Sequence, residues 1–310
     1  MTANAATPAN PGAPGAPGAP QTGAIHDIGY RHYDGARLGR GYIVRSLYLD
    51  SLRGGFGLGR SAKSKVVPLL LLAAMCLPAL VIAIVAAATK ATSLPGGYHA
   101  YVLNLEVLVA IYVAALAPAS VSRDLRFRFI SLYLSRPLRR SDYVFAKFTG
   151  LASAVFVVLA APLTILFVGA LLAKLPLADQ IRGYLAALAG AVVFALVLAG
   201  IGLVIAAVTP RRGLGIAAII SVLIVLIGVS GAAQSIANER GADTAAGYFG
   251  LISPFSLVQG LQTWLLDQEN PLPAGPPGTV GGLVFAGVTV VLVAGCYGLL
   301  LLRYRKVSVS

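Results

Sequence analysis

The chain has 310 residues, of which 57% are hydrophobic and 11% charged, and its formal net charge is +13. This composition is too apolar for a soluble domain and predicts a polytopic membrane protein. The basic residues flank apolar runs instead of forming a separate patch, so we expect no nucleic-acid partner. Both cysteines lie in apolar runs, which argues against a disulfide framework or a metal site.

The N-terminal region has two parts. Residues 1–25 are rich in Pro, Gly and Ala, and such a segment buries too little apolar surface to offset its ordering entropy, so we expect it to be disordered. Residues 26–65 are basic, and Gly41–Gly54 spaces its apolar residues near the helical period. This pattern predicts an amphipathic helix in the cytoplasmic membrane interface, the alternative being a connector with some membrane contact.

The segment Gly57–Ser64, GLGRSAKS, nearly matches the phosphate-binding pattern G-x-x-x-x-G-K-[ST]. Ala62 stands where the pattern has its second glycine, and an apolar run follows within two residues instead of a soluble helix. We therefore expect a basic linker here, no cofactor bound by this chain, and no catalytic residue.

Residues 66–302 contain six apolar runs that are long enough to cross a bilayer as helices, because a helix satisfies its own backbone hydrogen bonds. The runs are Val66–Ala88, Tyr98–Val121, Phe148–Ala173, Tyr184–Val208, Gly213–Ala233 and Val280–Leu302. The predicted fold is an all-α membrane domain with six transmembrane helices. The fourth run contains small residues that permit close helix packing, namely Ala186, Gly190, Gly200 and Gly202.

The charge distribution predicts the orientation of the domain. Six spans place both termini on one side of the membrane. If that side is cytoplasmic, the inner segments hold 20 Lys and Arg residues and the outer segments hold 4. The positive-inside rule therefore predicts cytoplasmic N- and C-termini, with residues 303–310 as a cytoplasmic tail. We expect the protein in the cell membrane, in contact with its lipids.

The second run carries the one charged residue found inside an apolar run, Glu106. A carboxylate in a span usually faces a bundle interior, a cavity or a partner. Asn104 is two residues away and so points to a different side of a helix. Three roles stay open for Glu106: a substrate contact, gate or proton-linked step; a hydrogen bond between helices; or snorkelling to the outer interface.

The outer segment Gln234–Thr279 precedes the sixth run. Within it, Ile252–Asp267 carries an apolar face, which predicts one or two short helices that dip back toward the membrane. The alternative is a plain surface loop. Trp264 is expected at the level of the outer headgroups.

The block between the second and third runs is basic and amphipathic. Arg123–Leu134 alternates charged and bulky residues, which predicts a short helix along the inner membrane surface. Pro137 is expected to end this helix, and Ser141 is expected to be the N-cap of the third span. The simplest alternative is that the arginines only fix the topology and contact lipid phosphates.

The same block carries a family resemblance. The run Leu134–Phe148, LSRPLRRSDYVFAKF, resembles the permease subunits of ABC-2-type ABC exporters, which have a type V exporter-like transmembrane domain. Those proteins have an acidic residue, an L-x-R-P-x-x-R segment and a Y-V-x-x-K sequence here. The matching residues are Asp124, Arg136, Pro137, Arg140, Tyr143, Val144 and Lys147.

The resemblance implies a non-catalytic permease that pairs with a second, identical or different, permease and binds two ABC ATPase subunits. ATP and Mg²⁺ are then bound by the ATPase, and the exported substrate is a lipid, a drug or another amphipathic molecule. The coupling helix between spans two and three meets the ATPase. The implied coupling residues are Asp124, Arg126, Arg128, Arg136, Pro137, Arg139 and Arg140.

Two other functions stay open from the residues alone. One is a secondary transporter or channel that uses Glu106 as an ion or proton site. The other is a non-transporting membrane anchor for a cytoplasmic complex.

Overall fold

The computed structural model describes Gly35 and residues 38–59, 62–91, 93–126, 138–209, 211–266 and 270–306. Contacts divide the chain into Met1–Arg37 and Leu38–Ser310, and the description below concerns the second unit. The tail predicted for residues 1–25 lies outside the described residues. All regular elements of the described part are helices, in agreement with the predicted all-α fold.

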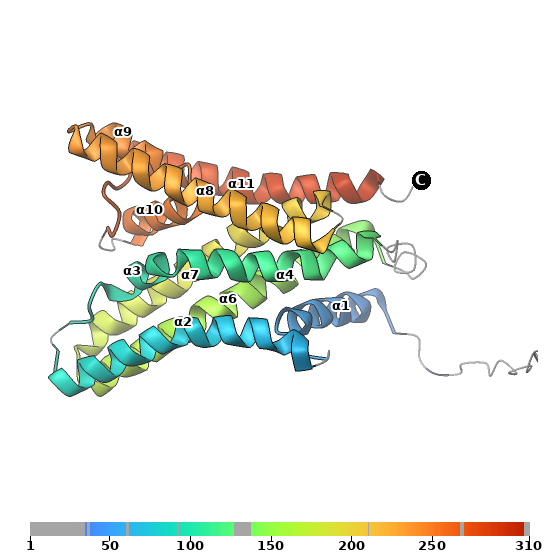
Figure 1. Cartoon of the computed structure of the whole chain (residues 1–310), viewed down its shortest axis with the longest axis horizontal. Helices are drawn as coiled ribbons and strands as arrows, with labels where there is room; N and C mark the ends of the chain where they lie inside the picture. Colours follow the sequence, from blue (N-terminus) through green and yellow to red (C-terminus); the bar gives the residue numbers. More distant parts are fainter. Residues whose placement is uncertain are drawn as a thin grey trace, which may run out of the picture. The chain divides into compact units, whose positions relative to one another are not determined.

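The helices follow one another without any strand between them in the described ranges (Figure 1). Their bounds are α1 Arg40–Gly55, α2 Ala62–Thr89, α3 Gly97–Asn104, α4 Glu106–Arg126, α6 Arg140–Leu172, α7 Leu177–Val208, α8 Arg212–Glu239, α9 Asp243–Phe249, α10 Pro254–Leu266 and α11 Gly278–Lys306.

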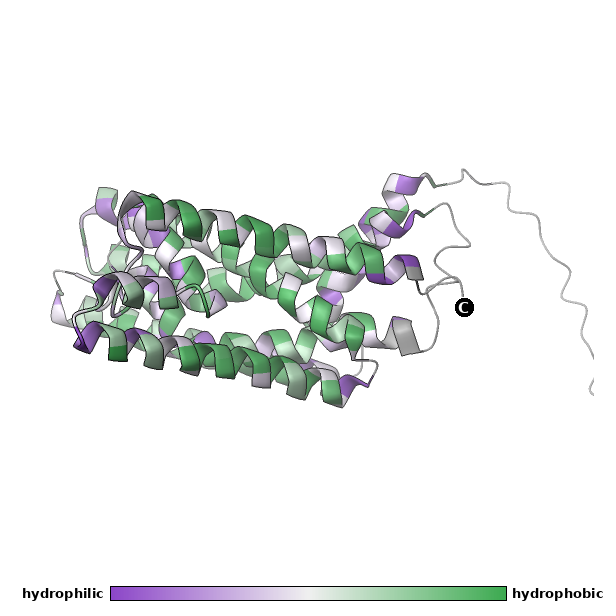
Figure 2. Cartoon of the chain, turned by 90° about the horizontal axis from the view of Figure 1, so that it is seen from above, coloured by the Kyte–Doolittle hydropathy of each residue, from purple (hydrophilic) through white to green (hydrophobic). Residues whose placement is uncertain are grey.

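Five of these helices, α2, α6, α7, α8 and α11, are long and apolar enough to cross a membrane. A sixth candidate consists of α3 and α4 together, which are bent by 57° relative to one another. Figure 2 shows hydrophobic residues along the helices and hydrophilic residues gathered toward their ends. The structure thus supports five spans, or six when the bent pair is counted as one.

The break in the second span lies at Leu105, a position that the apolar pattern does not mark. The amide of Leu105 donates to the carbonyl of Val102, and the next helix begins at Glu106. The buried side chains Tyr98 and Tyr101 fix α3 against the bundle. The Tyr101 hydroxyl donates to the carbonyl of Met75 in α2, and the Tyr98 hydroxyl donates to Gln180 at 2.7 Å.

Helices α6 and α7 form the centre of the domain. They pack against each other, α2 and α1 pack on α6, and α4 lies against α7 and α8. In the most apolar part of α7, 61% of the residues are buried, whereas in that of α8 only 17% are buried. The outward faces of α2, α8 and α11 carry exposed large hydrophobic side chains, as expected for helices that face lipid or another membrane subunit.

Glycines allow the closest approaches between these helices, as predicted for the fourth span. Gly202 lies against Val113 and Ala117 of α4, and Gly200 lies against Cys296 of α11. Among these contacts between helices, the tightest approach to the backbone of a neighbouring helix is at Gly169 of α6. A Cβ atom on Gly169 would lie 2.2 Å from the Cβ of Ala83 and 2.7 Å from its Cα. Small residues at these crossings let the helix backbones touch.

Helix α1 forms where the amphipathic pattern predicted a helix and extends it by one residue at each end. It packs on α6 and α4. Its Ser51 lies over Gly150 of α6, where a Cβ would be 2.6 Å away, and the Tyr48 hydroxyl donates to Ser153 at 3.0 Å. Helix α1 therefore packs directly against the helices of the bundle. Its location in the membrane interface stays a prediction.

The turn after α1 explains part of the sequence that nearly matches a phosphate-binding loop. Gly57 has a φ of 67°, and a Cβ on it would lie 2.4 Å from the carbonyl oxygen of Ser64. This glycine therefore serves a tight return of the chain into α2.

Helix α10 is enclosed by the bundle. Its first nine residues are all buried, and it packs against α7, α8 and α11. The ring of Trp264 covers Gly282 of α11, where a Cβ would come within 2.1 Å of the indole. Trp264 is thus half-buried against α11. Its predicted place at the outer headgroups, and the depth of α9 and α10 in a membrane, stay predictions.

Candidate functional site

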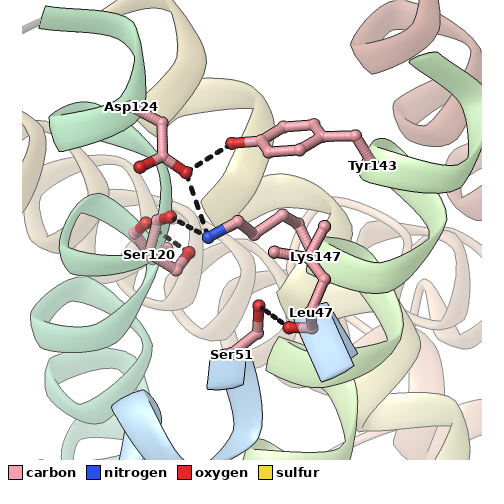
Figure 3. Close-up of polar contacts among 7 residues, drawn as sticks. Leu47, Ser51, Ser120, Asp124, Tyr143 and Lys147 are labelled. Carbon is pink, nitrogen blue, oxygen red and sulfur yellow. Dashed lines mark hydrogen bonds and ion pairs between the residues drawn. The ribbon is translucent and has the colours of Figure 1, made fainter. Parts of the chain in front are cut away.

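The candidate site is a buried group of polar side chains where α4 ends and α6 begins. We call Asp124, Tyr143 and Lys147 the base cluster (Figure 3). Asp124 lies in the last turn of α4, and Tyr143 and Lys147 lie in the first two turns of α6. Tyr143 and Lys147 are four residues apart, so both project from one face of α6 toward α4.

The polar contacts of the base cluster are short. The Tyr143 hydroxyl donates to the Asp124 carboxylate at 2.6 Å, and the Lys147 Nζ lies 3.1 Å from the same oxygen. Lys147 also donates to the backbone carbonyl of Ser120 at 2.9 Å. The side chains of Lys147 and Asp124 are only 8% and 12% exposed. Buried charges of this kind are stable only when they are paired, as these are.

Helix α11 joins the same end of the bundle. The ring of Tyr304 packs on Tyr143 with centroids 5.2 Å apart, and Arg140 donates to the carbonyl of Arg305 at 3.3 Å. Arg303 donates to the carbonyl of Ala207 at the end of α7. The ends of α4, α6, α7 and α11 are thus linked around the two ends of segment 127–137.

The first turn of α6 is fixed by Asp142. The amide of Arg139 donates to its carboxylate at 3.0 Å, and α6 begins at Arg140 with Arg139 as its N-cap. The prediction that Ser141 is the N-cap was therefore wrong, because the Asp142 carboxylate, not the serine hydroxyl, satisfies the free amide. Arg40 of α1 donates two hydrogen bonds to the same carboxylate, from Nε to Oδ2 at 2.6 Å and from Nη2 to Oδ1 at 2.5 Å. These bonds raise the pKa of Arg40 above its ordinary value.

Replacing Arg40 by Gln should loosen the start of α1 without unfolding the protein. The ion pair is partly exposed, so its loss costs little stability, but its two parallel bonds fix the geometry of the helix start. We expect faster amide hydrogen exchange in the first turn of α1 and an unchanged melting temperature. Arg45→Gln, an exposed change on the same helix, is the control. Equal exchange in both variants would contradict the role of the Arg40–Asp142 pair.

The structure places the predicted coupling residues in different settings. Asp124 is buried in the base cluster and faces α6. Arg139 and Arg140 are exposed and line an open hollow of about 620 Å³ together with Leu301 and Arg305. Arg128, Arg136 and Pro137 lie outside the described residues, as do the side chain of Arg126 and most of the predicted coupling helix. Their role in ATPase coupling stays a prediction.

Asn104 and Glu106 lie on either side of the break at Leu105. Asn104 ends α3 and is exposed, and Glu106 is the first residue of α4 and is half-buried. Within the described part of the chain, Glu106 makes no hydrogen bond or ion pair. A carboxylate in the first turn of a helix interacts favourably with the helix dipole. This interaction explains why the Glu106 carboxylate is tolerated at the start of α4 without a polar partner among the described residues.

Tyr143 and Lys147 match the family motif in the sequence, but the motif does not indicate that both side chains bind Asp124. The available signal was a four-residue spacing, which places the two on one helix face, opposite an acidic residue at the end of the preceding span. No comparable sequence pattern indicates that Arg40 and Asp142 form an ion pair. In the described ranges, no group of three or more His, Cys, Asp or Glu residues is arranged to hold a metal ion.

Comparisons with known proteins place these features in a family. The model of the ABC-2 family transporter protein matches residues 78–309, about three quarters of the chain. No curated protein matches the sequence. Permeases of this family typically work with an ABC ATPase partner and are generally non-catalytic transmembrane components. Together with its five or six candidate spans, the match shows that this multi-pass membrane protein belongs to the ABC-2 transporter family.

Proposed function

We propose that the chain is the transmembrane subunit of an ABC exporter in the cell membrane. It pairs with a second permease, identical or different, and binds two copies of a separate ATPase that hold ATP and Mg²⁺. The exported substrate is a lipid, a drug or another amphipathic molecule. The observation that supports this most directly is the base cluster, which holds the two ends of the basic segment 127–137 together.

The distribution of charge supports a cytoplasmic position for this end of the bundle. Arg40, Arg139, Arg140, Arg303 and Arg305 all lie near the base cluster. The positive-inside rule favours such an accumulation on the cytoplasmic side. Both termini and segment 127–137 then face the compartment that contains ATP.

The contacts of α6 suggest how force would pass from the ATPase to the spans. An ATPase that docks on segment 127–137 would push on the ends of α4 and α6, which the Asp124–Lys147 pair holds together. Helix α6 packs along α2 and α7, so displacement of its first turn would move these helices as rigid elements. Helix α1, tied to Asp142 by Arg40, would move with them.

Charge reversal in the segment tests this proposal. The protein is purified from its native host, and the associated ATPase is quantified for wild type and for the variant Arg128→Glu with Arg136→Glu. We expect the ATPase to co-purify with wild type and to be reduced at least about tenfold in the variant, since two attractive contacts become repulsive. Arg212→Glu, an exposed arginine at the start of α8, is the matched control and should retain the ATPase.

The outcomes separate the other functions from this one. Absence of any ATPase in the wild-type preparation would contradict the proposal. Transport that depends on a proton gradient, survives ATP depletion and is lost in Glu106→Gln would favour a secondary transporter. An ATPase that binds without any substrate movement in reconstituted vesicles would favour a membrane anchor.

A further inference from the structure

Helices α8 and α10 bury a group of uncharged polar side chains that the proposed function does not yet use. Ser230 and Gln234 lie on α8, and Ser256 and Gln259 lie on α10. Their exposed fractions are 0%, 1%, 6% and 0%, respectively. We call these four residues the amide cluster.

The hydrogen bonds within the amide cluster are incomplete. Ser230 donates to the carbonyl of Phe249 at 3.0 Å, and Gln234 donates to Ser230 at 2.9 Å. Ser230 and Ser256 are linked across the two helices at 3.4 Å. Among the residues that the structure describes, the Oε1 of Gln234 and both Oε1 and Nε2 of Gln259 have no hydrogen-bond partner. Two adjacent helices thus bury one donor atom and two acceptor atoms that no described residue satisfies.

The two glutamines occupy corresponding places on their helices. Phe255 of α10 packs on Phe194 of α7, and Gln262 donates to the carbonyl of Ala186, so α10 runs antiparallel to α7. Helix α8 follows α7 through the connection 209–211 and runs back beside α4. Gln259 lies one turn beyond Ser256, and Gln234 lies one turn beyond Ser230, in the same direction. Both amides therefore lie on the same side of the Ser230–Ser256 contact.

An apolar side chain would fit this location better than an unsatisfied amide. Buried polar atoms in folded proteins almost always have a hydrogen-bond partner, and a missing partner destabilises the fold. Three unsatisfied atoms on two helices that pack against each other therefore point to a group that binds between these helices and both donates and accepts hydrogen bonds.

We propose that the amide cluster binds the uncharged hydroxyl or amide headgroup of the exported molecule. This inference rests on the proposed exporter function and narrows its substrate class. The group is neutral because, in the described ranges, no Asp, Glu, Lys or Arg is buried on α7, α8, α9 or α10, and a charged headgroup would be left without a counter-ion. The buried charges Asp124 and Lys147 lie in the base cluster, on other helices.

Access to the cluster requires α8 and α10 to separate. The direct bond between their side chains, Ser230 to Ser256, is 3.4 Å long and so is weaker than an ordinary hydroxyl bond. On its other side, α10 is held by α11, where Gly260 lies against Phe285 and Trp264 covers Gly282. A movement of α8 away from α10 and α11 would therefore expose both glutamine amides while α10 keeps its place.

Binding of matched lipid probes tests this site. The full chain is purified in detergent, and its melting temperature is measured against dioctanoylglycerol, which carries one neutral hydroxyl, and against dioctanoyl phosphatidate, which has the same chains and an anionic headgroup. We expect dioctanoylglycerol to stabilise wild type with a saturable dependence on concentration. Its affinity should fall about tenfold in Gln259→Leu and in Gln234→Leu, because each variant removes hydrogen bonds to the hydroxyl.

The matched control is Gln262→Leu. This residue is buried on the same helix, but its amide already donates to Ala186, so the affinity for dioctanoylglycerol should not change. Gln259→Leu removes only unsatisfied atoms, and Gln234→Leu removes one unsatisfied oxygen together with the bond to Ser230, so both variants should fold. A cooperative melting transition without probe checks this for each variant, and two separate variants are made so that the test does not depend on either one.

Two results would overturn the inference. Equal affinity for dioctanoylglycerol in wild type and both leucine variants would mean that the cluster holds only water. A phosphatidate affinity that depends on Gln259 and Gln234, with no such dependence for dioctanoylglycerol, would mean that the headgroup is charged. ATPase co-purification is measured on the same preparations, so loss of the probe effect with the ATPase retained would refute the amide cluster alone and leave the exporter function intact.

Discussion

Replacing Lys147 by methionine should destabilise the protein by about 3–5 kcal/mol, because the buried carboxylate of Asp124 then loses its cationic partner. The Tyr143 hydroxyl still donates to Asp124 at 2.6 Å, but a neutral donor does not compensate the charge. The Ser120 carbonyl also loses the bond from Lys147. A lower melting temperature of the purified protein, together with faster hydrogen exchange at the end of α4 and the start of α6, would reveal the loss.

The double variant Asp124→Asn with Lys147→Met separates charge from packing. It removes both charges and keeps an oxygen acceptor for Tyr143, so it should recover most of the stability that the single variant loses. If the single and double variants were equally unstable, the loss would come from packing, and the buried ion pair would not be the link between α4 and α6.

Replacing Gly169 by valine should force α2 and α6 apart and cost about 3 kcal/mol. Even the first carbon of a side chain would lie 2.2 Å from the Cβ of Ala83 and 2.7 Å from its Cα. The Cα of Ala83 is backbone and cannot rotate away, so a whole helix must shift. The melting temperature should fall, and a disulfide or chemical cross-link engineered between α2 and α6 should form less efficiently.

Gly287→Val provides the matched control for this second prediction. Gly287 lies within α11, and a Cβ on it would meet nothing within 4 Å. The same substitution there should leave the melting temperature nearly unchanged. An equal loss at both positions would show that valine itself, and not the α2–α6 contact, destabilises these helices.

The spans could be predicted from the sequence because the bilayer imposes a simple rule on long apolar runs. The helix Gly41–Gly54 was predicted for a similar reason, since its apolar residues recur near the helical period. The break at Leu105 could not be predicted, because the run Tyr98–Val121 contains neither glycine nor a proline near that point. Tyr98 and Tyr101 next to the bend are buried and bonded to residues of other helices, and such contacts have no local sequence pattern.

Contacts between residues far apart in the sequence could not be predicted either. Asp124 and Lys147 belong to different helices, and only their packing brings the two charges to 3.1 Å. For α10, the sequence indicated one apolar face, whereas the structure buries its polar residues as well. Enclosure by α7, α8 and α11 is a property of the whole bundle, and residues such as Gln259 therefore could not be recognised as buried.

The position of the base cluster has a consequence for the evolution of partner choice. It fixes the two ends of the eleven-residue segment 127–137 through contacts that lie outside the segment. The entropy of closing a chain between fixed ends grows only with the logarithm of its length, and doubling the length costs about 0.6 kcal/mol. The segment can therefore be lengthened or exchanged between homologous proteins without repacking the spans, and under the proposed function such an exchange would change which ATPase binds.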